Sequence, residues 1–187
     1  MAELLKNLYS PKLIASLCSS LKSEYSQFDS ERFTANIFDR EWDEKELKSR
    51  MKHISKNLRK SLPNDYQEAL KILKSAAPDF SGFEYMFFPG YVELYGLGEY
   101  EASIPAHEYF TEFSSSEFAV RPFIEKYPNQ MMSQMEEWAE SDNHHIRRLA
   151  SEGCRPRLPW AKALPDFKKN PKPVLRVLEK LKNIHLK

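Results

Sequence analysis

The sequence predicts an all-α protein, a helical-repeat solenoid (an α-α superhelix) built from stacked helix pairs. Apolar residues recur at spacings of three and four along much of the 187 residues, which is the spacing of one helix face. Glycine is scarce, with 5 residues, whereas Phe and Tyr are plentiful, and no segment has the pattern of a strand. Two helices per unit with short connections favour a repeat architecture, and a compact bundle is the alternative.

The first 80 residues contain helix signals that carry no chemistry of their own. Ser10-Pro11 combines an N-cap serine with a proline at the first helical position, and an apolar helix face follows. Further helices are expected over 33–38, 47–62 and 64–77. The helix over 47–62 and the residues before it carry a basic run that we expect on a solvated face: Lys45, Lys48, Arg50, Lys52, Lys56, Arg59 and Lys60.

Prolines and glycines mark the interruptions in the rest of the chain. Pro89-Gly90 is expected to divide the aromatic segment 83–97 into two short helices. A helix over 115–126 is expected to bend at Pro122, and Gly153 to end a later helix as its C′ residue. The remaining helices are expected over 106–113, over 129–140 with its Met and Trp residues in the core, after an N-cap at Ser141 or Asp142, and from Asn170-Pro171 onward. The proline-rich segment 155–160 is predicted to be irregular.

Charge is strongly segregated along the chain, although the formal net charge is +1. Residues 1–78 carry 14 basic and 11 acidic groups, residues 79–142 carry 2 and 13, and residues 143–187 carry 12 and 3. A basic end on a nearly neutral chain is typical of a phosphate-binding surface. The alternative is that the acidic and basic segments face each other or simply solvate the fold.

Several classes of protein do not fit this sequence. No apolar run approaches the roughly 20 residues that cross a bilayer, and Glu3 and Lys6 interrupt any signal-peptide pattern. Cys18 and Cys154 are interpreted as cytoplasmic thiols, with Cys154 a small structural residue rather than a reactive one. We therefore expect a soluble, cytoplasmic monomer without membrane contact. There is no HExxH, CxxC or P-loop, so we expect no metal and no cofactor.

Two carboxylates have unusual positions. Glu117 follows three serines, and the string from Ser114 to Glu117 is also a capping box, in which the glutamate bonds back to the N-cap amide. Glu152 is expected in the last turn of a helix, where its charge opposes the helix dipole. The alternative for Glu152 is a surface carboxylate paired with Arg148 or Arg155. An unfavourable placement of this kind hints at function.

A cluster of arginines lies close to Trp160 in the sequence. Guanidinium groups bind phosphates with two parallel hydrogen bonds, and a Trp ring stacks on bases or attracts cations. The alternative is an Arg–Trp packing pair with no ligand. The arginines are Arg147, Arg148, Arg155 and Arg157.

Three strings of the sequence resemble the AlkC-type alkylpurine DNA glycosylases. They are Tyr91–Leu97, Ser116–Phe123 and Ile146–Ala161, and the last is long and unusual in composition. The resemblance runs from about residue 83 to 178, whereas residues 1–80 match only in general helical character. It implies one HEAT-like domain over 1–187, with generic helices over 1–80 and AlkC-like repeats over 83–187.

The resemblance also implies a function. It implies a DNA repair glycosylase that binds double-stranded DNA containing alkylated bases and hydrolyses the N-glycosidic bond of N3-alkylated purines such as 3-methyladenine, without a metal or an organic cofactor. Glu117 and Glu152 fall where the family has functional carboxylates, and Trp160 and Phe118 are expected at the lesion. The residues expected to contact DNA are Arg121, Arg147, Arg148, Arg155, Arg157 and Lys162.

Family chains continue into at least one more repeat, so we expect a shorter DNA groove in this chain, which stops at Lys187. A missing repeat would also remove a carboxylate from the groove. Two alternatives to the glycosylase therefore stay open. One is a DNA-binding solenoid without catalysis, and the other is a protein-interaction scaffold.

Overall fold

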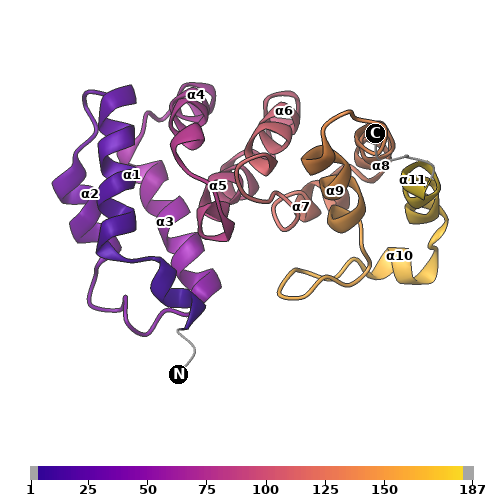
Figure 1. Ribbon diagram of the computed structural model, residues 1–187, viewed down its shortest axis with the longest axis horizontal. Coiled ribbons are helices and arrows are strands. Elements are labelled where there is room, and N and C mark those ends of the chain that lie inside the picture. Colours follow the sequence, from indigo (N-terminus) through magenta and orange to yellow (C-terminus); the bar gives the residue numbers. More distant parts are fainter. Residues whose placement is uncertain (1–3, 183–187) are drawn as a thin grey trace. The chain divides into compact units, whose positions relative to one another are not determined.

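The computed structural model describes residues 4–182, and it is all-α, as predicted (Figure 1). The described part contains eleven α-helices and three short 3-10 helices, and no strand. By contacts the chain forms two compact units, Met1–Ser114 (unit 1) and Ser115–Lys187 (unit 2). Among the residues described, no helix combines the length and the apolar character that crossing a membrane requires.

Unit 1 consists of two layers of helices. Helices α1, α4 and α6 pack against one another in one layer, and α2, α3 and α5 in the other, with α1 against α2 and α5 against α6 joining the layers. The helices are α1 (Pro11–Glu24), α2 (Ser30–Ile37), α3 (Leu47–Ser61), α4 (Tyr66–Ala76), α5 (Phe87–Tyr95) and α6 (Tyr100–Thr111). The 3-10 helices are η1 (Leu5–Leu8), η2 (Ala77–Asp79) and η3 (Phe83–Met86).

The N-caps of unit 1 follow from the sequence. The Ser10 side chain accepts a hydrogen bond from the Leu13 amide at 3.3 Å, ahead of Pro11 at the first helical position. Asp65 accepts one from the Glu68 amide at 2.8 Å in the same way. Each cap satisfies an amide that has no acceptor within its own helix. The predicted start of α1 is confirmed.

Three expectations for unit 1 are wrong. Arg50 is buried rather than solvated: its guanidinium lies 4.5 Å from the Trp42 ring centroid and donates to the Lys45 and Lys6 carbonyl oxygens at 3.0 Å. The two short helices expected in the aromatic segment do form, but the division is not at Pro89-Gly90: η3 ends at Met86 and α5 begins at Phe87. Pro89 lies in the first turn of α5, where a helix needs no donor. Helix α6 begins at Tyr100 and continues through Pro105.

His107 on α6 makes the stability of unit 1 depend on pH. The imidazole is fully buried, and this burial lowers its pKa from 6.5 to about 3. A histidine with a depressed pKa must bind a proton on unfolding below pH 6.5, so its contribution to stability is present above that pH and is lost as the pH falls toward 3. We expect the free energy of unfolding to fall by about 2 kcal/mol between pH 7 and pH 5 because of this residue.

Urea unfolding at the two pH values measures this loss. The variant His107→Gln should be less stable at pH 7 but should lack most of the added loss at pH 5. If wild type and variant lose stability equally on acidification, a different group is responsible.

Unit 2 contains five helices in its described part: α7 (Arg121–Lys126), α8 (Pro128–Trp138), α9 (His144–Gly153), α10 (Pro165–Lys169) and α11 (Lys172–Lys182). Helix α8 packs against α7, α9 and α11, and α9 also packs against α11. Met131, Met132, Met135 and Trp138 are buried on α8, so their predicted place in the core is confirmed.

Two helix ends in unit 2 differ from the prediction. The segment before Arg121 forms a turn, and α7 begins at Arg121. The expected helix over 115–126 with a bend at Pro122 therefore does not form. Pro122 instead lies in the first turn, where its missing donor costs nothing. The N-cap of α9 is Asn143, whose side chain accepts a hydrogen bond from the His145 amide at 2.9 Å. This residue lies just beyond the predicted Ser141 or Asp142.

Gly153 is the last residue of α9 and does not take the left-handed conformation expected of a C′ glycine. Its role is a close approach. A Cβ atom at this position would lie 2.9 Å from Val120 Cγ2 and 3.2 Å from Met135 Cε. Glycine therefore lets the end of α9 pack against these two side chains.

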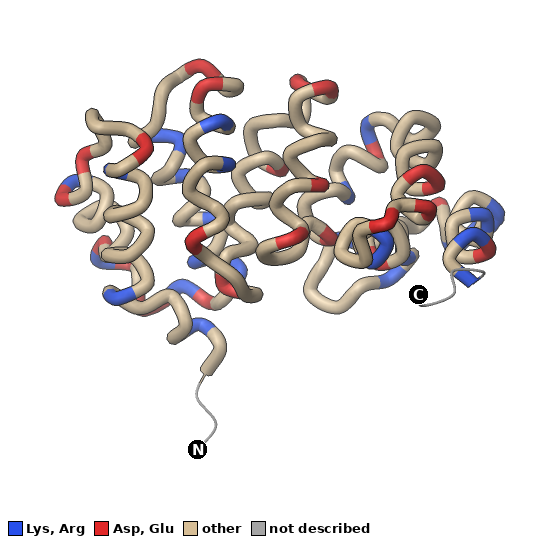
Figure 2. The backbone as a smooth tube through the Cα atoms, turned by 45° about the horizontal axis from the view of Figure 1, so that its top comes forward, with Lys and Arg blue, Asp and Glu red and all other residues tan. Residues whose placement is uncertain are grey.

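The acidic and basic segments of the sequence pair with each other inside unit 2. Figure 2 colours the Lys and Arg positions along the backbone blue and the Asp and Glu positions red. Arg176 on α11 donates to Glu136 on α8 at 2.7 Å, and Lys180 donates to Glu140 at 2.7 Å. Two further pairs, described below, also join residues 143–187 to residues 79–142. Part of the basic charge is therefore neutralised by carboxylates. Exposed pairs of this kind contribute only about 0.2–1 kcal/mol each.

Candidate functional site

The irregular segment predicted around 155–160 is the site loop, residues 154–164 between α9 and α10 (the orange segment in Figure 1). Two internal hydrogen bonds fold it: Leu164 N–H donates to Pro156 O at 3.0 Å, and Ala161 N–H to Leu158 O at 3.1 Å. The side chains of Leu158 and Leu164 are buried and anchor the loop to unit 2. The remaining residues are then presented at the surface.

Trp160 is the most exposed of the three Trp residues, with 58% of its surface accessible, whereas Trp42 and Trp138 are buried. It is also the one non-glycine residue of the described chain with a positive φ, at 64°. The left-handed conformation costs an L-residue about 1–2 kcal/mol. An exposed, strained aromatic residue is an arrangement that folding alone does not favour and that functional sites often contain.

Each of the two predicted carboxylates is bonded to an arginine. Glu152 accepts a hydrogen bond from Arg155 Nη1 at 2.7 Å, and its side chain is 27% exposed. Glu117 accepts one from Arg148 Nη2 at 2.9 Å and is 13% exposed. Glu117 lies in the turn before α7 and Glu152 in the last turn of α9. The pairing with Arg155 offsets the unfavourable position of Glu152 at a helix C-terminus.

Arg155 lies near both carboxylates. Its pKa is raised chiefly by the hydrogen bond and charge of Glu152, and the charge of Glu117 raises it further. Glu117 and Glu152 thus act on the same guanidinium, although they are far apart in sequence. The two carboxylates therefore lie within electrostatic range of one guanidinium.

The capping-box interpretation of Glu117 does not hold in the structure. The Ser114 amide donates to Phe110 O at 3.0 Å, as the end of a helix does. The Glu117 carboxylate is bonded to Arg148 instead, and its own amide donates to Ser115 Oγ at 3.4 Å. Glu117 is therefore available for a role other than closing a helix turn.

Arg121 is not in a position to contact DNA, and this expectation is wrong. Its side chain is fully buried, and its guanidinium donates to three backbone carbonyls of residues 153–162. Helical spacing did not predict this burial. The sequence places Arg121 near the middle of the expected helix 115–126, whereas the observed helix α7 begins at Arg121. A basic residue flanked by Val120 and Pro122 is the only signal in the sequence.

The other predicted basic residues lie at the surface with different partners. Arg147 Nη1 donates to the Ser141 and Asp142 carbonyls at 2.8 Å, which orders the loop before α9. Lys162 Nζ donates to Glu125 at 2.6 Å. Arg157 is exposed and has no ion pair in the described part of the chain. Of this group, Arg157 has the guanidinium most available to a phosphate.

An open hollow of about 440 Å³ lies on the site loop. Arg155 and Arg157 provide its charge, and the rest of its lining is apolar or backbone: Leu158, Pro159, Ala161 and Ala163. A hollow with two guanidinium groups and short apolar side chains suits a phosphodiester with its sugar.

The other residues singled out in the sequence differ in their surroundings. Cys154 is buried, its thiol donates to Ala150 O at 3.1 Å, and burial raises its pKa to about 12, so the structural interpretation is confirmed. Phe118, expected at the lesion, is half-buried in the turn beside Glu117. The rings of His144 and His145 lie 3.9 Å apart. Within the described residues, no group of three potential metal ligands comes together.

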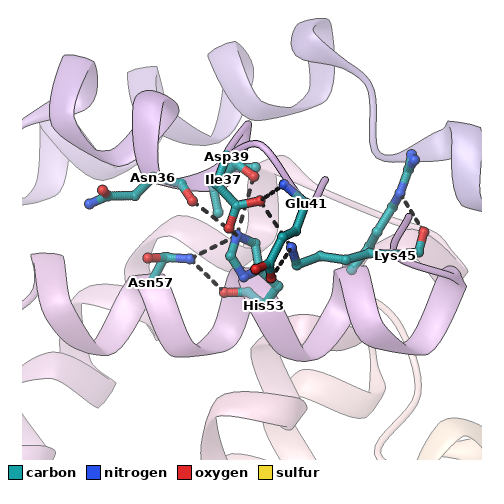
Figure 3. Close-up of polar contacts among 8 residues, drawn as sticks. Asn36, Ile37, Asp39, Glu41, Lys45, His53 and Asn57 are labelled. Atoms are coloured by element: carbon teal, nitrogen blue, oxygen red, sulfur yellow. Dashed lines mark hydrogen bonds and ion pairs between the residues drawn. The ribbon is translucent and has the colours of Figure 1, made fainter. Parts of the chain in front are cut away.

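Unit 1 holds a polar cluster that the sequence did not indicate (Figure 3). Asp39 accepts hydrogen bonds from Lys45 Nζ at 2.9 Å and the Glu41 amide at 3.1 Å, and lies 3.5 Å from His53 Nε2. Burial raises the pKa of Asp39, but the Lys45 hydrogen bond and the His53 charge outweigh it and leave the pKa lowered. The same His53 nitrogen lies 2.9 Å from Asn36 O. The cluster ties the α2–α3 connection to α3.

The chain resembles two known proteins along nearly all or all of its length, while no family model matches it. It is 48% identical over 177 residues to the uncharacterized protein YhaZ of Bacillus subtilis (strain 168). This match covers 95% of this chain and 50% of that protein. The second is the solved structure of the Pseudomonas fluorescens alkylpurine DNA glycosylase AlkC bound to DNA containing an abasic site analog. That match has a TM-score of 0.94 at 34% identity and covers 100% of this chain and 52% of that chain.

The chain therefore spans about half the length of the relatives it matches. Over that half, the all-α, HEAT-like fold expected from the sequence is confirmed by the structural match. The match also extends over residues 1–80, for which the sequence indicated only general helical character.

Proposed function

Because this chain resembles the AlkC-type alkylpurine DNA glycosylases in both sequence strings and fold, we propose that it acts on double-stranded DNA containing alkylated bases. Its reaction would be hydrolysis of the N-glycosidic bond of cationic N3-alkylated purines such as 3-methyladenine. The observation that carries the proposal is that Glu117 and Glu152, each bonded to an arginine, both act electrostatically on Arg155, which lies on the loop that presents Trp160.

The chemistry fits two carboxylates and an aromatic ring. An N3-alkylated adenine carries a positive charge, so its glycosidic bond is already weakened. One carboxylate near the sugar would stabilise the positive charge that develops as the bond breaks, as in glycoside hydrolysis. A second would orient or deprotonate the attacking water. Trp160 would hold the cationic base or sugar against its ring face.

The arginine partners of the carboxylates fit a site that is assembled by DNA. Arg148 and Arg155 are half-exposed, so each guanidinium is accessible to a phosphate. A phosphodiester that takes over these hydrogen bonds would leave the carboxylates free to face the sugar and the cationic base. Binding of DNA and exposure of the carboxylates would then be one event.

The exposed Arg157 offers a test of DNA contact. We expect Arg157→Ala to weaken binding of any duplex sequence about three- to ten-fold and to reduce the slope of log affinity against log salt by about one, because one phosphate contact is lost. Titrations by fluorescence anisotropy at several salt concentrations measure both quantities. Arg32→Ala, the same charge change on an exposed residue of α2, is the control. An unchanged slope for Arg157→Ala would remove this residue from the interface.

The function itself is tested by base release. The purified chain is incubated with a duplex containing 3-methyladenine, and free base is followed by chromatography. Release that depends on Glu117 and Glu152 supports the proposal. DNA binding without release would favour the non-catalytic solenoid, and no binding even at low salt would favour the protein scaffold.

A further inference from the structure

We propose that Arg121 is a positioning residue: its buried guanidinium fixes the end of α9 and the site loop in the conformation that presents Glu152, Arg155 and Trp160. The proposal rests on the proposed function only for its effect on catalysis. Its structural part concerns how unit 2 holds an eleven-residue loop, 154–164, that has little regular structure.

The guanidinium of Arg121 is bonded at three points on the segment from the end of α9 through the site loop. Nη1 donates to Gly153 O at 2.9 Å, Nη2 donates to Arg155 O at 2.8 Å, and Nε donates to Lys162 O. The first acceptor follows Glu152 directly, the second is the carbonyl of Arg155 itself, and the third lies two residues beyond Trp160. One side chain therefore joins both ends of the segment that carries the candidate site.

Burying the charge of Arg121 is energetically unfavourable, which indicates that the guanidinium has a specific role. No carboxylate forms an ion pair with Arg121 within the described residues, and burial lowers its pKa. A buried cation is unfavourable unless strong hydrogen bonds replace its hydration. Here three carbonyls replace it, and the buried one, Gly153 O, would lose this hydrogen bond if the guanidinium were removed. The arrangement specifies a loop conformation rather than adding a packed core residue.

The site loop has few interactions of its own that could hold its conformation. Its own hydrogen bonds span only Pro156 to Leu164 and Leu158 to Ala161, and Trp160 holds a strained backbone conformation with φ 64°. A strained residue persists only where its surroundings over-determine it. Gly153 contributes as well, because the absence of a Cβ lets the end of α9 approach Val120, the neighbour of Arg121.

Lysine cannot replace arginine in this role. Its single ammonium group cannot reach three carbonyls that a planar fork meets from three nitrogens. Arg121→Lys keeps the charge and removes this geometry, so it tests the position of the loop rather than the charge. Arg50→Lys is the matched control, because Arg50 is also buried and donates to two backbone carbonyls, but in unit 1.

Limited trypsin digestion reports the loop directly. Trypsin cuts after Arg157 and Lys162 in the site loop, whereas Arg155 is protected by the proline that follows. We expect Arg121→Lys to speed cleavage at these two sites about ten-fold, because the cleavage rate follows the population of the open loop. Arg50→Lys should leave these two cuts at the wild-type rate. Equal loop cleavage in folded Arg121→Lys and wild type overturns the proposal.

Two further measurements separate positioning from catalysis. Acrylamide quenching reports chiefly Trp160, because the other two Trp residues are buried, and it should increase in Arg121→Lys. Base release by this variant should lose kcat about ten-fold with KM changed less than three-fold, as expected for misplaced groups. If the wild type releases no base, the proposed function fails, while cleavage and quenching still decide the positioning role.

A variant that does not fold leaves a test on the wild type. Hydrogen exchange of the Leu164 and Ala161 amides measures whether the loop is held, since both donate within it. We expect both to exchange at least about ten times more slowly than in an unstructured peptide. Exchange at the unstructured rate overturns the proposal.

Discussion

Glu152→Gln is expected to reduce base release from alkylated DNA about 100-fold or more, because it removes a carboxylate without changing the shape of the side chain. The fold should survive. Glu152 is part of an exposed i,i+3 pair and opposes the dipole of α9, so its neutralisation should change the free energy of unfolding by less than about 1 kcal/mol. DNA affinity should stay equal or increase, because Arg155 loses its competing carboxylate.

Glu136→Gln is a closely matched control for Glu152→Gln. Glu136 on α8 also accepts an arginine hydrogen bond at 2.7 Å, from Arg176, and is 26% exposed against 27% for Glu152. Glu136→Gln therefore removes an equivalent ion pair at a similar depth outside the candidate site. We expect it to release base at the wild-type rate. Single-turnover assays on both variants make the comparison, and a fully active Glu152→Gln would remove Glu152 from the reaction.

Trp160→Gly is expected to lower base release about 10- to 100-fold while leaving the fold as stable as before. The loss follows from the stacking and cation–π contacts that a Trp ring makes with a cationic base, worth about 1–3 kcal/mol. Stability should change by less than about 1 kcal/mol, because glycine relieves the left-handed strain and its greater freedom in the unfolded chain offsets that gain.

Trp160→Tyr keeps an aromatic face at the same position and should retain most of the activity. Urea unfolding and single-turnover base release on the two variants separate the contributions. A loss of stability in Trp160→Gly that matches its loss of activity would mean that Trp160 is a packing residue. Wild-type release by Trp160→Gly would mean that the ring does not touch the lesion.

The elements that the sequence predicted well are those with local causes. The serine and aspartate caps of α1 and α4 each accept a hydrogen bond from an amide three residues away, so neighbouring residues in the sequence are enough to predict them. The buried Met and Trp residues of α8 likewise follow from helical spacing. Glu117, Glu152 and Trp160 were identified because the strings around them resemble a known family.

The elements that the sequence missed depend on contacts between distant residues. Arg121 looks like a surface cation in sequence, yet it is buried because carbonyls 153, 155 and 162 surround it. Gly153 looks like a helix terminator, yet it is needed because Val120 packs against it. Pro122 looked like an interior kink because the true start of α7 was not apparent. These features depend on residues that are distant in the sequence or on helix ends, so patterns of neighbouring residues did not predict them.

The most direct test of the two-carboxylate site is a single-turnover assay at saturating protein on a duplex that contains one 3-methyladenine. The assay measures the amounts of free base and of abasic sites in the same samples. We predict equal amounts of both products from the wild-type chain, and neither above background from the double variant Glu117→Gln, Glu152→Gln. Saturated binding with no release by the wild type, or equal release by the double variant, would contradict a site built from these two carboxylates.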